Sequence, residues 1–292
     1  MRTNIPTTSR PEPIGGSRAQ LYLDNVLVST DYKSAFTRAA HSTGLRERMM
    51  DKFDWTKSDF DNINLEAIES VKLRLPYPQS LQISKMLHNY SQTGYMRNKW
   101  GHEGGCPSCD EPLETQLHLY RCPDPTMRAS MAESVQQMED TLLRKNIPNI
   151  VVRHFLHMVR DTCHLPTREH DVSCDLCTHA CEAQARLGTE AILMGYLAKD
   201  WTHAIAKHYR PPPAPNNDPS DTHAPHPSHL STILVDELWK LWLAIWATRN
   251  NIFLNTDNRV TNAEDARVTY RTHNTLQGKL QQDPTAMRLA TA

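Results

Sequence analysis

Four potential metal ligands lie close together in the middle of the chain and constrain its fold more than any other feature. Cys106, Cys109, His118 and Cys122 have the spacing C-x2-C-x8-H-x3-C. Structural zinc sites use four Cys or His side chains in a tetrahedron. The C-P-S-C tetrapeptide can fold both thiolates around one ion, and one helical turn brings His118 and Cys122 to the same face. The spacing therefore predicts a closed structural zinc site within residues 101–125.

Other interpretations of these four residues have less support. Without a metal, they would be buried free thiols beside a surface histidine. Zinc deaminases place H-x-E well upstream of P-C-x-x-C, whereas here Glu103 directly follows His102 and only two residues separate it from the first cysteine of the motif. No H-E-x-x-H motif occurs. Because four protein ligands leave no open position on the ion, we expect that the chain is not an enzyme.

A second group of cysteines follows farther along the chain. Cys174, Cys177 and Cys181 share one face if the chain is helical from residue 174 onward. They can form a second metal site, whose candidates for a fourth ligand are Cys163, His164 or His170. The alternative is that small thiol side chains pack this helix against its neighbours, because free cysteine is among the most buried residue types.

The stretch before the zinc motif is basic and aromatic. No acidic residue occurs between Glu69 and Glu103. Single-strand binding proteins combine cations that contact phosphates with aromatic rings that stack on bases. We predict a face that binds RNA or DNA, made of Lys72, Arg74, Lys85, Tyr90, Tyr95, Arg97, Lys99 and Trp100. The alternative is that Tyr90 and Trp100 belong to the core and the cations form a solvated rim.

The overall charge limits the kind of partner that the chain can bind. Its 292 residues include 32 Lys and Arg and 33 Asp and Glu, which gives a formal net charge of −1. This balance excludes a uniformly basic coat and predicts modest, salt-sensitive binding to nucleic acid. No apolar stretch approaches the roughly 20 residues of a membrane span, and the N-terminal segment lacks the apolar region of a secretory signal. We expect an intracellular protein, nuclear or cytoplasmic, without membrane contact.

Helical periodicity predicts an all-α fold, an irregular multi-helix assembly around one small zinc knuckle. Asn64, Thr115 and Asp124 are capping residues that predict helix starts. A helix is expected over 81–90, with Leu81, Met86, Leu87 and Tyr90 on its apolar face. A longer helical stretch over 176–208 has a possible break at Gly188. No strand-like alternation persists.

A Pro-rich linker precedes a helix that contains Trp239, Trp242 and Trp246 and is apolar on nearly every side. We interpret it as a buried helix; otherwise residues 238–246 would form a partner surface. The predicted regions are a tail (1–20), an N-terminal helical region (21–100), the zinc knuckle (101–125), a helical region (126–209), the Pro/His-rich linker (210–230), C-terminal helices (231–282) and a tail (283–292).

The zinc motif and its flanks resemble the zinc-binding region that follows the reverse transcriptase of non-LTR retrotransposons. The matching residues are Trp100, Cys106, Pro107, Cys109, Glu114, Thr115, His118, Leu119, Cys122 and Pro123. Such regions have a helix and a T-G turn before the knuckle, here residues 85–87 and 93–94, and often end in W-x-x-R-N, here 246–250. Residues 53–68 and 184–201 resemble retroelement-derived open reading frames of the kind abundant in diatoms.

The resemblance covers about residues 25–285 and implies a non-catalytic module that binds zinc and assists RNA or DNA handling. The chain has no Tyr-x-Asp-Asp motif and no endonuclease signature. Its middle spacing is longer than that of retroviral nucleocapsid knuckles, so their mode of RNA binding does not transfer. The alternative function is a zinc-stapled helical scaffold that acts through protein contacts.

Overall fold

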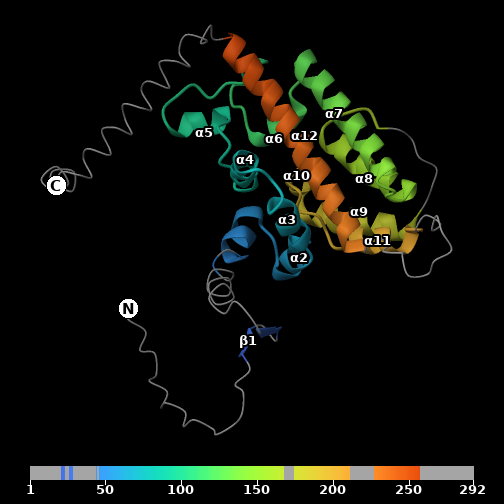
Figure 1. Ribbon diagram of the computed structural model, residues 1–292. Coiled ribbons are helices and arrows are strands. Elements are labelled where there is room, and N and C mark those ends of the chain that lie inside the picture. Colours follow the sequence, from blue (N-terminus) through green and yellow to red (C-terminus); the bar gives the residue numbers. More distant parts are fainter. Residues whose placement is uncertain are drawn as a thin grey trace, which may run out of the picture. The chain divides into compact units, whose positions relative to one another are not determined.

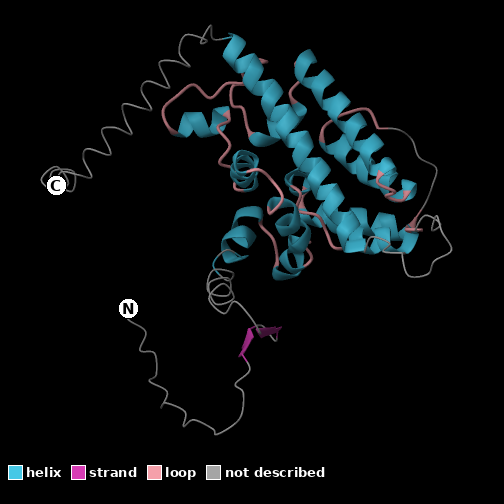
Figure 2. Ribbon diagram, in the orientation of Figure 1, coloured by secondary structure: helices cyan, strands magenta, loops and turns pink. Residues whose placement is uncertain are grey.

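The computed structural model describes residues 21–23, 26–28, 44, 46–167, 174–210 and 227–256. Most of these residues are helical (Figures 1 and 2), which confirms the predicted all-α class. The chain divides into two units, Met1–Phe60 and Asp61–Ala292. The predicted tails, most of the Pro/His-rich linker and the predicted helix beyond Thr256 lie outside the described residues.

The first unit contains a short hairpin that we did not predict. Strands β1 (Leu21–Leu23) and β2 (Val26–Val28) pair antiparallel, with Leu21 opposite Val28. Two apolar runs around an Asp-Asn pair are a hairpin signal, but three-residue strands are too short to show alternation. In the same unit, residues 46–53 are helical and the rings of Phe53 and Trp55 stack at 4.4 Å. Helix α2 (Lys57–Asp61) crosses the boundary between the units.

The second unit is built around its last described helix, α12 (Pro227–Thr256). The helices before it are α3 (Leu65–Lys72), α4 (Tyr77–Leu87), α5 (Gly94–Lys99), α6 (Gln116–Arg121), α7 (Pro125–Arg144), α8 (Asn149–Thr162), α9 (Asp175–Leu187), α10 (Thr189–Met194) and α11 (Asp200–His208). Helix α12 contacts α3, α6, α7, α10 and α11 (Figure 1). It begins inside the predicted linker because proline is tolerated in the first turn of a helix.

The tryptophans of α12 confirm that it is a buried helix. Trp239 and Trp242 are fully buried, and the indole Nε1 of Trp239 donates to the carbonyl of Met194 at 3.0 Å. Trp246 is partly exposed and stacks on Trp242 at 5.4 Å. Leu238 is also buried, so most of residues 238–246 are unavailable as a partner surface.

The three predicted capping residues begin helices as expected. The Asn64 side chain accepts from Ala67 N, and Asp124 accepts from two amides of α7. The predicted helix over 81–90 is wrong in its bounds and its apolar face, because α4 begins at Tyr77 with Pro78 in its first turn. Its buried residues are Ile83, Met86 and Leu87, whereas Leu81 and Tyr90 are exposed.

The helical stretch from residue 175 to 208 is broken twice, at the predicted Gly188 and again at Gly195. Gly195 has φ +85°, and a Cβ there would lie 2.7 Å from the indole Nε1 of Trp239. Residues 197–199, which follow this break, pair with residues 62–64 before α3. Asn64 N donates to Leu197 O and Lys199 N donates to Asn62 O, both at 2.8 Å.

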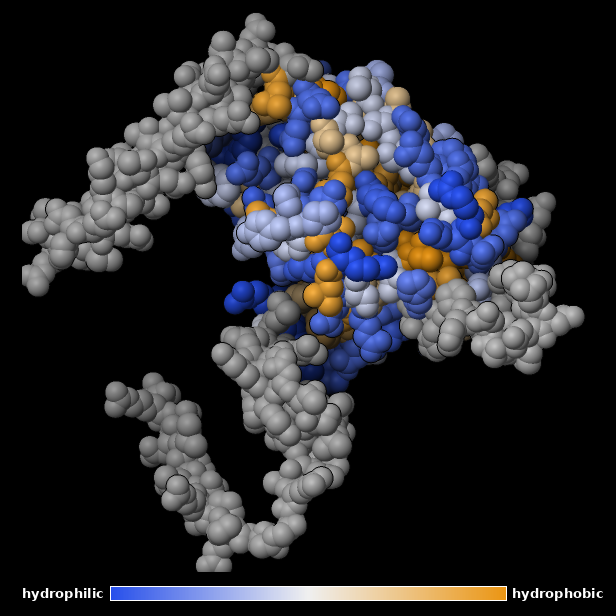
Figure 3. Space-filling view, in the orientation of Figure 1, coloured by the Kyte–Doolittle hydropathy of each residue, from blue (hydrophilic) through white to orange (hydrophobic). Residues whose placement is uncertain are grey.

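The described surface is mostly polar. Hydrophilic side chains cover most of the described face in Figure 3, and hydrophobic ones gather there in small patches. Among the helices of the described residues, none has both the length and the apolar character of a membrane span.

Gly195→Ala is expected to lower the free energy of unfolding by about 2–4 kcal/mol. Alanine disfavours the left-handed backbone conformation of this position, and its Cβ would clash with Trp239. Gly101→Ala is the matched control, since Gly101 has φ +80° with no atom near the added Cβ. Urea unfolding followed by tryptophan fluorescence measures both. Equal losses would show that the contact with the indole contributes nothing.

Candidate metal centre and adjoining groove

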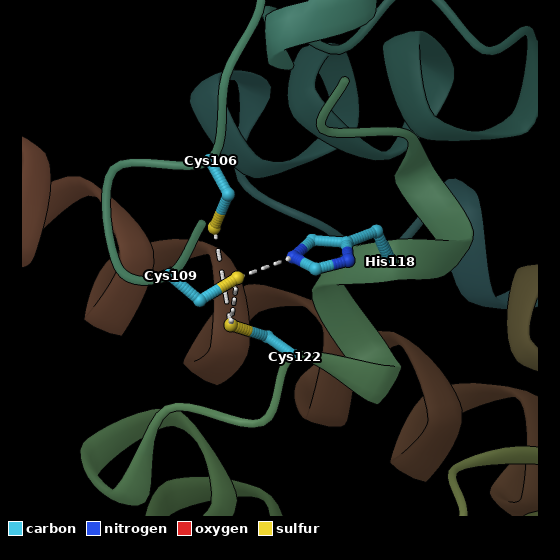
Figure 4. A group of neighbouring side chains, drawn as sticks. All are labelled: Cys106, Cys109, His118 and Cys122. Atoms are coloured by element: carbon cyan, nitrogen blue, oxygen red, sulfur yellow. Dashed lines mark hydrogen bonds between the residues drawn. The ribbon is translucent and has the colours of Figure 1, made fainter. Parts of the chain in front are cut away.

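The structure brings the four predicted zinc ligands together around one point (Figure 4). The Cys122 sulfur lies 3.8 Å from the sulfurs of Cys106 and Cys109, and Cys109 Sγ lies 3.5 Å from His118 Nε2. A tetrahedral ion with metal–sulfur bonds of about 2.3 Å holds two sulfurs about 3.8 Å apart. A disulfide would need about 2.05 Å between them. The group therefore has the geometry to hold a metal ion.

Local structure positions each ligand. Cys106 and Cys109 lie in the loop before α6, while His118 comes from α6 and Cys122 caps its C-terminal end. The Thr115 hydroxyl accepts from His118 N at 3.1 Å and so fixes the start of the helix. Backbone amides point at the sulfurs: Ser108 N lies 3.4 Å from Cys106 Sγ, and the backbone of Glu111 and Asp124 bonds Cys109 and Cys122. Donors of this kind stabilise thiolate ligands.

The ligands influence one another's protonation. A hydrogen bond with the Cys122 thiol lowers the pKa of Cys106 to about 3 and raises the pKa of Cys122 far above its usual value. A hydrogen bond with Cys106 raises the pKa of His118, and burial raises the pKa of Cys109. A metal ion that binds here therefore displaces protons.

A buried ion pair joins the loop between α5 and α6 (residues 100–115, the metal loop) to α12. Glu114 and Arg249 are 0% and 3% exposed. The Arg249 guanidinium donates to both Glu114 oxygens, from Nε at 2.9 Å and from Nη2 at 2.6 Å. Gly94 N donates to the same carboxylate at 2.7 Å. A buried ion pair stabilises a fold only when further hydrogen bonds satisfy both charges, as they do here.

Gly94 allows the metal loop to approach the start of α5. A Cβ at this position would lie 1.8 Å from the carbonyl oxygen of Gly104 and 2.9 Å from Glu114 Cβ. Glu114 N donates to Gly104 O, and Tyr95 N donates to Glu114 O, both at 2.9 Å. Only glycine therefore fits where the T-G turn, the metal loop and Glu114 meet.

A groove of about 830 Å³ adjoins this junction. Residues of α4, α5, the segment after α5 and the C-terminal half of α12 line it. Its chemistry comes from Lys85, Arg97, Trp100, Trp246 and Phe253, and no Asp or Glu is among its described lining residues. The Arg97 guanidinium lies 4.7 Å from the centre of the Phe253 ring, and Trp100 is 58% exposed.

The predicted nucleic-acid face is only partly assembled at this groove. Lys85, Arg97 and Trp100 line it. The predicted residues that do not line it are Lys72, Arg74, Tyr90, Tyr95 and Lys99. Arg74 Nε donates to Ser70 O, and Lys99 lies 4.7 Å from the Tyr95 ring. The contribution of α12 was missed, because no local pattern links residues 246–254 to residues 85–100.

The second cysteine group differs from the prediction. The structure assembles Cys174 and Cys177 with His208, and their ligand atoms lie within 4.8 Å of one another. Cys181 is not in this group. It lies seven residues after Cys174, which corresponds to a rise of about 10 Å along the helix. Two ligands of one zinc ion lie at most about 4.6 Å apart. Cys163 is fully buried, and burial raises its pKa to about 12.

The other two candidates for a fourth ligand also lie elsewhere. His164 is not in the group either, and His170 lies outside the described residues. His208 was missed because it follows the cysteines by about 30 residues, at the end of another helix.

No protein family, curated protein or solved structure matches the chain.

Cys106→Ser and His118→Ala are each expected to lose the ion of the Cys3His group and to open residues 101–125 to protease, because this segment depends on its ligands for order. Metal analysis of the purified protein and limited proteolysis measure the two effects. Cys163→Ala is the control, since Cys163 belongs to neither cluster. Unchanged metal content and protease resistance in both ligand variants would contradict the assignment.

Arg249→Met is expected to cost about 3–5 kcal/mol of unfolding free energy, because it leaves the Glu114 carboxylate buried without its partner. The double variant with Glu114→Gln should lose less unfolding free energy than the two single variants lose in sum. The difference, measured by urea unfolding, is the coupling energy and is expected to be about 1–3 kcal/mol. Asp236→Asn on the same helix removes a partly exposed ion pair with Lys240, whose ammonium keeps its pair with Glu237, and should cost under about 1 kcal/mol. Additive losses at Glu114 and Arg249 would contradict the coupling.

Proposed function

We propose that the chain is a non-catalytic zinc protein of retrotransposon origin that binds single-stranded RNA or DNA in the groove beside its metal centre. The proposed origin depends on the resemblance of residues 100–123 and 246–250 to the zinc-binding region of non-LTR retrotransposons. Glu114 and Arg249, which belong to these two segments, form the buried ion pair.

Zinc is the metal that the ligand set favours. Three thiolates and one imidazole are soft or borderline donors, and zinc accepts them in a tetrahedron. The sulfur–sulfur separations of 3.8 Å agree with this ion. Four protein ligands complete its coordination, so we assign it the role of holding the loop rather than activating water.

The observation that carries the proposal is the lining of the groove. It offers the cations Lys85 and Arg97 beside the aromatic rings of Trp100, Trp246 and Phe253, without any acidic residue among the described lining positions. Cations contact phosphates, and aromatic rings stack on bases of any sequence. Arg249 also lines the groove, but its charge is paired with Glu114. The groove therefore suits a flexible, anionic, base-bearing strand.

The net charge of −1 favours the alternative, a helical scaffold in which zinc only staples the fold. Long-range attraction to nucleic acid is weak for such a chain. The two functions differ in one property, which is whether changes confined to the groove alter nucleic-acid binding.

Trp100→Ala is expected to weaken binding of a labelled single-stranded oligonucleotide about tenfold, the effect of losing one stacked base. Lys85→Gln should weaken binding and reduce the salt slope by about 0.7, since one phosphate contact is lost. Fluorescence anisotropy over a range of salt concentrations measures both, with RNA and DNA compared.

Two matched variants outside the groove serve as controls. Tyr77→Ala removes a ring that is 79% exposed, and Lys72→Gln removes a charge on α3. Both should bind like the unaltered protein, since neither residue lines the groove. Equal losses in groove and control variants, or no salt-dependent binding at all, would favour the scaffold.

A further inference from the structure

We propose that Cys174, Cys177 and His208 form a second, three-ligand site for a zinc ion, with its fourth position open to an external ligand. This site is independent of the groove and of the Cys3His group. Nothing in the first site's function requires it, and different residues build it.

The first turn of α9 supplies two of the ligands. Cys174 is the N-cap residue of the helix, and its sulfur accepts from Cys177 N at 3.4 Å. This capping bond turns the Cys174 side chain back over the first turn, toward Cys177. Cys177 is fully buried, while Cys174 is partly exposed. The C-x2-C spacing therefore lets two sulfurs bind the same ion, as C-P-S-C does in the first site.

The third ligand comes from the opposite end of a neighbouring helix. His208 is the last residue of α11, and its Nε2 lies 3.1 Å from Cys174 Sγ. Helices α9 and α11 pack together and run antiparallel, since His179 farther along α9 bonds Asp200 at the start of α11 at 3.0 Å. An ion at the cysteines would tie the end of this helix pair that the His179–Asp200 contact does not reach.

The geometry is close to what a zinc ion needs. All three ligand atoms lie within 4.8 Å of one another. A tetrahedral zinc ion holds sulfur and nitrogen about 3.6 Å apart, so binding requires Cys174 and His208 to separate by only about half an ångström. Two thiolates and an imidazole select zinc over magnesium or calcium, which take oxygen ligands.

The number of ligands distinguishes this site from the first. Among the described residues, the second group offers three donors where the first offers four. A tetrahedral ion with three protein ligands keeps a position for water or another small ligand. We therefore expect the second ion to be held more weakly than the first and to exchange more readily.

The test counts zinc per chain. The 292-residue protein, equilibrated with buffered excess zinc and analysed by native mass spectrometry, should hold two ions, and a mild chelator should remove one first. His208→Ala should hold only the Cys3His ion. Cys181→Ser is the matched control and should keep both, since Cys181 lies one turn beyond the ligands. A single ion in the unaltered protein, or both ions in His208→Ala, would overturn the site.

Two further results separate this proposal from the others. Cys106→Ser should retain the second ion, so failure of the first site leaves the second testable. If Cys181→Ser lost the second ion, the ligand assigned to His208 would instead be Cys181, and the proposed site would be wrong. Cobalt substitution tests the open position: azide should shift the visible bands of the unaltered protein but not those of His208→Ala. No shift in either protein would overturn the open fourth position.

Discussion

The ion pair between Glu114 and Arg249 is the interaction on which the second unit's functional region depends. It joins residues that lie 135 positions apart and places a carboxylate with no exposed surface against a guanidinium. The same carboxylate accepts from Gly94 N, so three segments meet at one side chain. Because an unpaired charge at this depth is strongly destabilising, the start of α5, the metal loop and α12 have to come together as one arrangement.

A second junction holds the opposite part of the unit by backbone pairing. Ile63 forms an isolated β-bridge with Ala198. The buried Gln184 side chain donates to Tyr196 O and accepts from Ala198 N, which fixes the chain between α10 and α11. The segments 53–68 and 184–201, noted in the sequence for the same resemblance, therefore meet through residues 61–64 and 197–199. Their sequence patterns have a packing explanation that needs no ligand.

The sequence predicted what neighbouring residues determine among themselves. Asn64, Thr115 and Asp124 cap the helices they were expected to cap, because a side chain and an amide two or three residues away suffice. The first metal group was predictable because its ligands lie within 17 residues. His208 and Arg249 were not, because their roles arise only when distant helices pack. Cys181 is not in the assembled group, because a shared helix face brings together sulfurs one turn apart but not those two turns apart.

The metal centre can support the groove without touching its contents. An ion at Cys106 and Cys109 fixes the loop whose two ends, Gly104 and Glu114, are hydrogen-bonded to each other. Glu114 in turn orients Arg249, and the Arg249 guanidinium lies against the rings of Trp246 and Phe253 in the groove. Glu114 and Arg249 are buried and Trp246 and Phe253 are half-buried, so a displacement of the loop would reach the rings through this ion pair. In the function we propose, a closed site of this kind would serve binding by keeping aromatic surfaces in place.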